Sequence, residues 1–343
     1  MEKLKIGITL GDINGISPEV IIKALSDERI LELFTPIIYG STKVIAYHKN
    51  IVEGENFMFN SISEASKSRY NAVNVLNCWE EKANIDLGKP TKESGKFAHI
   101  ALDRAIRDVK SNQIDGIVTA PINKNAMKMS GFNFPGHTEF IAHSYNSKRD
   151  LMMFVSDSMK MALATKHVPL KDVPQMITKD FISSRLEVFN KTLIEDFGIE
   201  RPTIAVLGLN PHAGEDGNIG NEEETEIRPA IIEAKKNGMM VMGPYSADGF
   251  FGSGMYRKFD GIMAMYHDQG LIPFKALSFG DGVNFTAGLP IIRTSPDHGT
   301  GYDIVGKNVA DASSITKAIY CAIDIIRSRK EYFESRENAL VSE

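Results

Sequence analysis

The sequence predicts an α/β fold in which helices cover both faces of a mostly parallel sheet. Residues 4–10 alternate apolar side chains with others in the period of two that is typical of a strand. This segment runs into a loop that contains Gly11 and Gly15, and the residues behind the loop favour a helix. Short apolar runs and helical patterns continue to alternate along the chain, which indicates parallel strands joined by helices.

The first helix is expected directly after that loop. Ser17 can act as its N-cap and Pro18 suits its first helical position, so we expect a helix from Pro18 to about Leu25. The later strands are predicted from short apolar runs at residues 36–39, 72–76, 115–121, 151–155, 161–165, 203–209, 239–242 and 261–265.

Two longer helices are predicted from their periodicity. Between Lys92 and Lys110 apolar residues recur every fourth position, and the pairs Asp103–Arg107 and Arg104–Asp108 are expected to be exposed. A C-terminal helix is expected at about 314–327. The residues after Arg329 are rich in charged side chains and serine, and we expect them to be loosely held.

Length and composition limit the class of protein. At roughly 150 residues per domain, 343 residues suggest two domains. No linker rich in Pro, Gly and Ser separates them, which indicates that the chain crosses between domains more than once. The net charge of −5 and the lack of a basic stripe disfavour binding to nucleic acid.

The cysteines and the apolar segments indicate the cellular compartment of the protein. Cys78 and Cys321 form no CxxC pair, so neither a zinc ribbon nor a disulfide framework is supported. No apolar run reaches the ~18 residues of a membrane helix, and the N-terminal residues lack the pattern of a signal peptide. We therefore expect a cytoplasmic protein with no membrane partner.

Three histidines follow three predicted strands. His167 comes after 161–165, His212 after 203–209 and His267 after 261–265. The carboxyl ends of parallel strands meet at the edge where such sheets bind ligands. Three neutral imidazoles with an open fourth position suit Zn²⁺ or a similar ion. The alternative is that each histidine caps its own strand end by hydrogen bonding.

Other residues favour binding of an anion. Thr138, after Gly136 and His137, could be the N-cap of a helix whose N–H groups face a phosphate or carboxylate, although plain helix capping explains it equally well. Two cations and an amide that could bind a phosphorylated acid lie further along the chain, although each alone is more often a surface residue: Lys275, Asn284 and Arg293.

The loop 297–307 contains two glycines that would let the backbone approach a ligand closely. Its Asp303 could accept hydrogen bonds from ribose hydroxyls, which favours NAD over NADP. The sequence contains no GxGxxG fingerprint, Walker A loop, HExxH or GxSxG motif.

Six blocks together resemble the 4-hydroxythreonine-4-phosphate dehydrogenase family of vitamin B6 biosynthesis. In chain order they are Ile8-Thr-Leu-Gly-Asp12 with Gly15 and Pro18-Glu19, Thr119-Ala-Pro-Ile-Asn-Lys124, Gly136-His-Thr-Glu139, Asn210-Pro-His-Ala-Gly-Glu215, Tyr266-His-Asp-Gln-Gly270 and His298-Gly-Thr-Gly-Tyr-Asp303. The resemblance spans nearly the whole chain. The opening loop departs from the family pattern Gly-Asp-Pro-Ala-Gly-Ile-Gly-Pro-Glu at Ile13, Asn14 and Ser17.

The resemblance implies a fold similar to isocitrate and isopropylmalate dehydrogenases, with two α/β/α domains that flank an active-site cleft. We expect a discontinuous first domain at 1–130 and 280–343, and a second domain at 131–279 that carries the dimer interface. The family forms homodimers with shared active sites. It uses NAD and one divalent ion per site, with zinc, magnesium and cobalt as the candidates.

The resemblance also implies roles for individual residues. The metal ligands, contributed by both subunits, would be His167, His212 and His267. The substrate and its phosphate would contact His137, Thr138, Lys275, Asn284 and Arg293. The last loop resembles the adenosine-binding loop of isopropylmalate dehydrogenases, which suggests His298, Gly299 and Asp303 near NAD. Asp248 is a candidate proton acceptor, with a metal-bound water as its rival.

The implied reaction is the oxidation of 4-phosphohydroxy-L-threonine to 2-amino-3-oxo-4-phosphobutanoate, which decarboxylates to 3-amino-2-oxopropyl phosphate on the route to pyridoxal 5'-phosphate. A paralogous group acts on 4-phospho-D-threonate or 4-phospho-D-erythronate, and the sequence leaves both substrates open. A two-metal phosphatase would need clustered aspartates that the sequence lacks. A sensor that binds phosphorylated metabolites without turnover would need no metal ligands.

Overall fold

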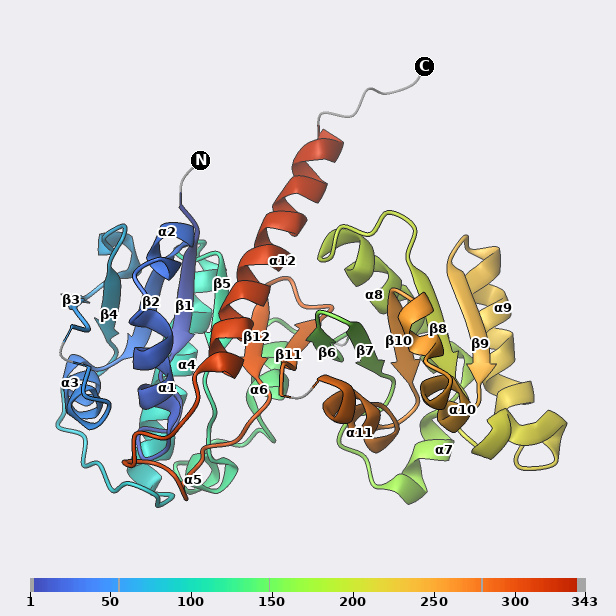
Figure 1. Cartoon of the computed structure of the whole chain (residues 1–343), viewed down its shortest axis with the longest axis horizontal. Coiled ribbons are helices and arrows are strands. Elements are labelled where there is room, and N and C mark those ends of the chain that lie inside the picture. The colour runs from blue at the N-terminus through green and yellow to red at the C-terminus, as the bar shows by residue number, and fades with distance from the viewer. Residues whose placement is uncertain (1–2, 55, 148, 279, 338–343) are drawn as a thin grey trace. The chain divides into compact units, whose positions relative to one another are not determined.

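The computed structural model describes residues 3–54, 56–147, 149–278 and 280–337. The chain forms two compact units, shown in Figure 1. Unit 1 comprises Met1–Asn146 and Pro290–Ile326, and unit 2 comprises Ser147–Leu289 and Arg327–Glu343.

Each segment near an expected domain boundary belongs to the unit with which its own residues make contacts. Residues 131–146 belong to unit 1, where the rings of Phe132 and Phe140 pack edge-on against His99 at 5.0 and 5.3 Å between centroids. Residues 280–289 belong to unit 2, where they supply a strand. Residues 327–343 also belong to unit 2, where Arg329 Nε donates to Asp196 Oδ1 over 2.6 Å.

Unit 1 contains a parallel sheet in the order β3-β4-β2-β1-β5-β12. Its strands are β1 (Lys5–Thr9), β2 (Thr35–Gly40), β3 (Phe59–Ile62), β4 (Val73–Asn77), β5 (Gly116–Thr119) and β12 (Arg293–Pro296). Central strands such as β2 are buried along their whole length. Parallel strands covered on both faces show such continuous burial. The predicted α/β fold is thus confirmed in unit 1.

The helices of unit 1 include the two that the periodicity predicted. They are α1 (Ser17–Leu25), α2 (Ile30–Leu33), α3 (Thr42–Ile51), η1 (Ala65–Lys67), α4 (Lys92–Lys110), α5 (Lys124–Met129), α6 (His137–Ser144) and the first part of α12 (Ser313–Glu337). Helix α4 has the predicted bounds. Helix α12 continues to Glu337, so the expectation of a loosely held tail after Arg329 is wrong for residues 330–337. Residues 338–343, to which the expectation also applies, lie outside the described residues.

The expected N-cap of α1 is also wrong. Ile16 takes the N-cap position, and Ser17 is already helical. The Ser17 hydroxyl instead donates to the carbonyl oxygen of Pro121 over 3.0 Å in a buried position. Ser17 therefore joins the opening loop to the segment after β5, a long-range contact that local capping rules do not anticipate.

Unit 2 contains a mixed sheet in the order β11-β6-β7-β10-β8-β9. Its strands are β6 (Leu151–Ser156), β7 (Met159–Leu163), β8 (Thr203–Leu207), β9 (Met240–Tyr245), β10 (Gly261–Ala264) and β11 (Val283–Ala287). Strands β7, β10, β8 and β9 are parallel, whereas β6 is antiparallel to both β11 and β7. Two residues separate β6 from β7. Such a connection permits only a hairpin, because parallel neighbours need a longer crossover.

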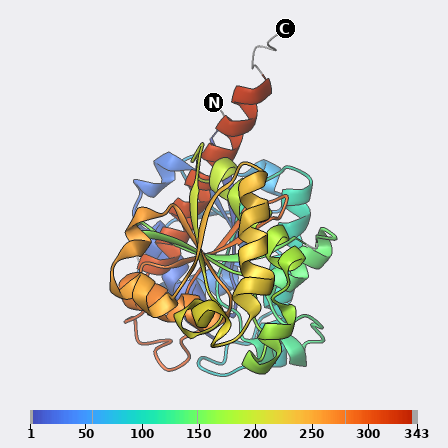
Figure 2. The ribbon, with the colours of Figure 1, turned by 90° about the vertical axis from the view of Figure 1, so that its right-hand side faces the viewer.

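Helices flank both faces of the unit 2 sheet. Figure 2 shows the strands with α9 in yellow on one side and orange helices of residues 247–278 on the other. The helices are η2 (Leu170–Asp172), α7 (Val173–Met176), α8 (Lys179–Glu195), η3 (Pro211–Gly217), the π-helical turn η4 (Glu223–Ile227), α9 (Arg228–Lys236), α10 (Ala247–Gly252), η5 (Met255–Lys258) and α11 (His267–Ser278). Among the helices of the described residues, none combines the length and the apolarity that crossing a membrane requires.

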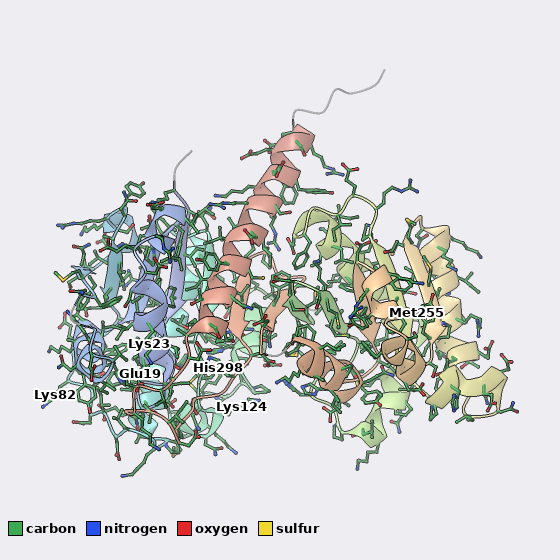
Figure 3. All side chains as sticks on the ribbon, viewed as in Figure 1. Glu19, Lys23, Lys82, Lys124, Met255 and His298 are labelled. Carbon is green, nitrogen blue, oxygen red and sulfur yellow. The ribbon has the colours of Figure 1, made fainter. Side chains whose placement is uncertain are left out.

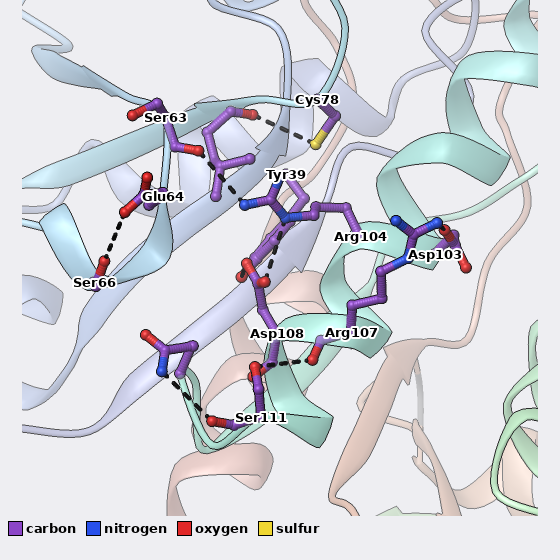
Figure 4. A network of polar contacts seen from close by, with 12 residues as sticks. Tyr39, Ser63, Glu64, Ser66, Cys78, Asp103, Arg104, Arg107, Asp108 and Ser111 are labelled. Carbon is purple, nitrogen blue, oxygen red and sulfur yellow. Dashed lines mark hydrogen bonds and ion pairs between the residues drawn. The ribbon is translucent and has the colours of Figure 1, made fainter.

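A polar network links α4 to β2 in unit 1 (Figure 4). The Tyr39 hydroxyl donates to Asp108 Oδ2 over 2.8 Å, and Arg104 Nε donates to Asp108 Oδ1 over 3.3 Å. Asp108 is only 8% exposed, so the expectation that the Arg104–Asp108 pair is exposed is wrong. Asp108 is buried because its carboxylate has both a hydroxyl and a guanidinium as partners. The Asp103–Arg107 pair lies on the outer side of the helix, as expected.

His48 joins α3 to the loop that follows β1. Its Nε2 donates to the carbonyl oxygen of Ile13 over 2.9 Å, and its side chain has no exposed surface. The other ring nitrogen, Nδ1, is buried and has no hydrogen-bond partner among the described residues. Burial lowers the pKa of His48 to about 4, because a protonated ring would place an unpaired N–H in the core.

We predict that His48 makes the protein sensitive to acid. The unfolded chain takes up a proton at this histidine below a pKa of about 6.5, whereas the folded chain takes it up only below about 4. The stability due to neutral His48 is therefore complete above about pH 6.5 and decreases as the pH falls, by roughly 2–3 kcal/mol at pH 4.5. His48→Gln keeps a donor for the Ile13 carbonyl oxygen. Its free energy of unfolding, measured by urea denaturation, should decrease less between pH 7 and pH 4.5 than that of the unaltered protein.

The matched control for this prediction is His143→Gln, because His143 is exposed in α6. That variant should lose stability with falling pH as the unaltered protein does. If His48→Gln and the unaltered protein showed the same loss between pH 7 and pH 4.5, the prediction would be wrong.

Candidate functional site

The three histidines that follow strands lie after neighbouring parallel strands. Strand β10 pairs in parallel with β7 on one side and with β8 on the other. The carboxyl ends of all three strands therefore meet at one edge of the sheet, as expected. The rings of His167 and His267 lie 5.9 Å apart between centroids, at an interplanar angle of 42°.

His267 has a partner that fixes its ring. Its Nδ1 lies 2.7 Å from Asp268 Oδ1, a geometry in which Nδ1–H donates to the carboxylate. Nε2 then remains as the nitrogen that can bind a ligand. Metal-binding histidines commonly donate their other ring nitrogen to a carboxylate in this way, so the His267 side chain fits a metal ligand.

His212 lies in an unusual turn after β8. Residues 212–216 all have positive φ, with values of 53° at His212, 51° at Ala213 and 44° at Glu215. Residues other than glycine adopt this left-handed conformation at an energetic cost, so a run of such residues is unusual. The sequence gives little sign of this turn, because only Gly214 and Gly217 within it are glycines.

Asp248 of α10 lies close enough to His212 to interact with it electrostatically. The pKa of Asp248 is lowered mainly by a hydrogen bond from the Ser246 hydroxyl, with a smaller contribution from His212. Asp248 is therefore ionised at neutral pH and can accept a proton. Sequence reasoning singled out this residue only from its glycine-rich surroundings.

Within residues 3–54, 56–147, 149–278 and 280–337 of one chain, no group of three or more His, Cys, Asp or Glu side chains is arranged to hold a metal ion. His167 and His267 nevertheless form a close pair of imidazoles at the strand edge. This donor chemistry suits zinc and related ions. The resemblance implies ligands from two subunits, and such a set is not complete in a single chain.

A second cluster of predicted residues lies in unit 1, around Arg293 at the start of β12. Arg293 is 4% exposed. Its Nε donates to Thr119 Oγ1 over 2.9 Å, and Nη1 lies 3.5 Å from Thr138 Oγ1. Burial lowers the pKa of Arg293 to about 10, so the side chain is still charged at neutral pH. A desolvated guanidinium with hydroxyl neighbours is well suited to bind a phosphate.

His137 belongs to the same cluster. Its Nδ1 lies 3.5 Å from Arg293 Nη2. Burial, followed by the positive charge of Arg293, lowers the pKa of His137 well below its usual value. The imidazole is therefore neutral at physiological pH and can either donate or accept a hydrogen bond.

The expectation that Thr138 caps a helix is wrong. Helix α6 begins at His137, and Gly136 takes the N-cap position without a side-chain cap. The Thr138 hydroxyl lies instead beside Arg293. The first turn of α6 still places the positive end of a helix at this cluster, which favours an anion.

The remaining predicted substrate residues lie in unit 2. Lys275 is exposed in the last turn of α11. Asn284 is half-buried in β11, where it pairs with Phe154 of β6. The five predicted residues are thus divided, with His137, Thr138 and Arg293 in unit 1 and the other two in unit 2.

The loop that follows β12 is held against the opening loop and α1 by hydrogen bonds of buried and half-buried side chains. The Tyr302 hydroxyl donates to Asp12 Oδ2 over 2.6 Å, and the Gly306 N–H donates to Glu19 Oε1 over 2.7 Å. Lys23 Nζ donates to the carbonyl oxygens of Asn308 and Ala310 over 3.0 and 2.8 Å. Figure 3 labels Glu19, Lys23 and His298 in this region.

These contacts give the opening loop a role that the sequence did not reveal. Asp12 and Glu19 are almost fully buried, and burial raises the pKa of each carboxyl group. Within the loop that they hold, Asp303 is exposed, and His298 Nδ1 lies 2.9 Å from the Gly299 carbonyl oxygen. Asp12 and Glu19 were the only sign of this role in the sequence. The glycines between which Asp12 lies are equally typical of a tight turn, so the sign was not specific.

Asn14, where the sequence departs from the family pattern, also has a structural role. Its side chain donates to the Lys89 carbonyl oxygen over 2.9 Å and accepts from the Asp86 N–H over 2.9 Å. The departure thus adds contacts between the opening loop and residues 86–89.

Comparison with known proteins shows which family the chain resembles. Residues 32–322 match the family described as pyridoxal phosphate biosynthetic protein PdxA. A 4-hydroxythreonine-4-phosphate dehydrogenase of Bacteroides thetaiotaomicron is 50% identical over 339 residues, which cover 98% of this chain and 93% of that protein. A protein of Oceanobacillus iheyensis, provisionally named D-threonate 4-phosphate dehydrogenase, is 39% identical over 93% of this chain and 97% of its own length.

The fold is similar to that of a solved relative. The crystal structure of a 4-hydroxythreonine-4-phosphate dehydrogenase from Burkholderia phymatum superimposes with a TM-score of 0.81 at 36% identity, over 95% of this chain and 99% of that one. Both the sequence and the fold therefore lead to the same assignment: the chain belongs to the PdxA family of pyridoxal phosphate biosynthetic proteins.

Proposed function

We propose that this protein is an NAD-dependent 4-hydroxythreonine-4-phosphate dehydrogenase that acts in the cytoplasm as a homodimer with one divalent ion per active site. It would oxidise 4-phosphohydroxy-L-threonine to 2-amino-3-oxo-4-phosphobutanoate, which loses CO₂ to give 3-amino-2-oxopropyl phosphate. The observation that carries the proposal is the buried Arg293 cluster in a chain 50% identical to a relative of that name.

Unit 1 would supply the phosphate contacts. Arg293 is charged and desolvated, and its nitrogens lie near hydroxyls of Thr119 and Thr138. Neutral His137 can donate a further hydrogen bond to a phosphate oxygen. The phosphate does not react, so these contacts would serve to fix the position of the substrate's carbon chain. The resemblance also assigns substrate contacts to Lys275 and Asn284.

Unit 2 of both subunits would supply the ligands of the divalent ion, His167, His212 and His267. Once bound, the ion would lower the pKa of the substrate's 3-hydroxyl group and stabilise negative charge during decarboxylation, while NAD would accept the hydride. Asp248, ionised at neutral pH and close to His212, would accept the proton from that hydroxyl. His298, Gly299 and Asp303 would contact NAD.

A second candidate substrate is a phosphorylated sugar acid. The relative provisionally named D-threonate 4-phosphate dehydrogenase favours it. 4-Phospho-D-threonate carries a hydroxyl at C2 where 4-phosphohydroxy-L-threonine carries an amine, and the phosphate and metal residues would serve both molecules.

The proposed reaction is tested by following NADH absorbance with each substrate. Metal-dependent NADH formation is expected with 4-phosphohydroxy-L-threonine and not with 4-phospho-D-threonate or 4-phospho-D-erythronate. A signal only with a sugar acid would assign the second function. No signal with any of the three in the presence of several divalent metals would refute the dehydrogenase proposal for these substrates.

Arg293→Lys should weaken substrate binding. Lysine keeps the charge but cannot reproduce the planar fork of donors, and the loss of a charged hydrogen bond costs about 1.5–3 kcal/mol. We expect KM for the phosphorylated substrate to rise about 10- to 100-fold, with a much smaller change in kcat. Inorganic phosphate should also inhibit the variant less strongly.

The control is Arg29→Lys, because Arg29 is largely exposed in unit 1 and pairs with Asp27. Its KM should equal that of the unaltered enzyme. An Arg293→Lys enzyme with normal KM and normal inhibition by phosphate would show that this cluster does not bind the substrate's phosphate.

Removal of the metal should abolish activity reversibly. A chelator is expected to stop NADH formation, and added Zn²⁺, Co²⁺ or Mg²⁺ should restore it. His267→Ala should bind no Co²⁺ in calorimetry, because it lacks one of the proposed ligands. His143→Ala serves as the control and should bind Co²⁺ normally. Full activity after exhaustive chelation would contradict the metal requirement.

A further inference from the structure

Segment 208–210 connects β8 to the turn that carries His212, and a side chain from α11 holds its first residue. Gln269 Nε2 donates to the carbonyl oxygen of Gly208 over 2.6 Å. The same side chain accepts, through Oε1, from the N–H of Met265 over 2.7 Å. Gln269 thus links the end of β10, which leads to His267, to the end of β8, which leads to His212.

A buried carboxylate holds the rest of the segment. Glu223 Oε1 accepts from the N–H groups of Leu209 and Asn210, both over 2.7 Å. Its Oε2 accepts from Asn210 Nδ2 over 2.9 Å. The side chain is only 1% exposed. It replaces water as the partner of two backbone donors at the place where the chain leaves the sheet.

Glu223 also packs against the left-handed turn itself. A Cβ added to Gly214 would lie 2.7 Å from Glu223 Oε2, and one added to Gly208 would lie 3.1 Å from Oε1. The carboxylate therefore occupies the space between the two glycines. Left-handed conformation costs roughly 1–2 kcal/mol for each residue other than glycine, so the turn depends on support from its surroundings.

We propose that Glu223 and Gln269 are positioning residues that hold His212 in place for binding of the divalent ion. The inference rests on the proposed metal-dependent function. Neither side chain belongs to the proposed ligand set. Each acts through the backbone of segment 208–210, and together they fix that segment from two sides.

This role has a physical consequence that a general packing role lacks. A displaced imidazole can still fold into the structure, but it no longer presents its nitrogen at the distance and angle that a metal ion requires. Loss of groups that orient metal ligands typically lowers metal affinity about 10- to 100-fold. Substitution of either residue should therefore weaken metal binding strongly while it changes the stability of the metal-free protein only slightly.

The test compares two conservative variants with one control. Glu223→Gln keeps the size of the side chain but places an amide group among N–H donors. Gln269→Glu keeps the size but replaces the donor to Gly208 with a carboxylate oxygen. The control, Glu224→Gln, removes the same charge from the neighbouring residue, which is exposed and pairs with Arg228 over 2.7 Å.

We measure the dissociation constant of Co²⁺ by calorimetry, the visible absorption of bound Co²⁺, and the melting temperature of the metal-free homodimer. Both variants are expected to bind Co²⁺ about 10- to 100-fold more weakly, with a changed absorption spectrum. Glu224→Gln should match the unaltered protein. At low Co²⁺ concentration both variants should also have a lower kcat. Saturating Co²⁺ should restore much of it, whereas a folding defect would not respond to the metal.

Unchanged Co²⁺ affinity and spectrum in a folded Glu223→Gln or Gln269→Glu protein would overturn the inference for that residue. If Glu223→Gln does not fold, Gln269→Glu decides the proposal in the same measurements. If the unaltered protein binds no Co²⁺, the proposed metal-dependent function fails, and this inference fails with it. Binding by the unaltered protein and by both variants alike refutes only the positioning role.

Discussion

The parallel pairing of β7, β10 and β8 is the constraint on which the candidate metal ligands depend. Parallel strands all end at the same edge of a sheet, so residues far apart in the sequence reach one place without any local motif. His167 and His267 come within 5.9 Å between ring centroids in this way. The hairpin of β6 and β7 does not disturb this edge, because β7 still runs parallel to β10.

Buried charge is the second feature shared by the functional regions of the two units. Arg293, Asp12, Glu19 and Glu223 are all almost fully buried, although removal of a charge from water is costly. Each has polar partners that offset part of this cost. Arg293 lies where an anion would bind, whereas the three carboxylates hold backbone loops that carry predicted ligand-binding residues. In the proposed function, buried charge in this chain would therefore serve both recognition of the phosphate and support of the loops.

Much of the fold followed from local patterns, and the errors have a common cause. Helix α4 and the strand cores were predictable because side chains on a buried face repeat with the period of the element. The expected caps Ser17 and Thr138 were wrong because their hydroxyls contact Pro121 and Arg293, which are distant in the sequence. Asp108 of α4 was wrongly expected to be exposed for the same reason, since its partner Tyr39 lies on the distant strand β2.

The sequence by itself determined the alternation of strands and helices, the histidines at three strand ends, and the family, because these follow from periodicity and from blocks of adjacent residues. Only the tertiary structure decided which side chains support them. Glu223 stands in a run of acidic residues that is typical of an exposed surface, and Gln269 stands between residues with more obvious chemistry. The hydrogen-bond partners of Glu223 lie 13 or more positions away in the sequence. Gly208, one partner of Gln269, lies 61 positions away. Such contacts form only once the strands have aligned, so no local pattern records them.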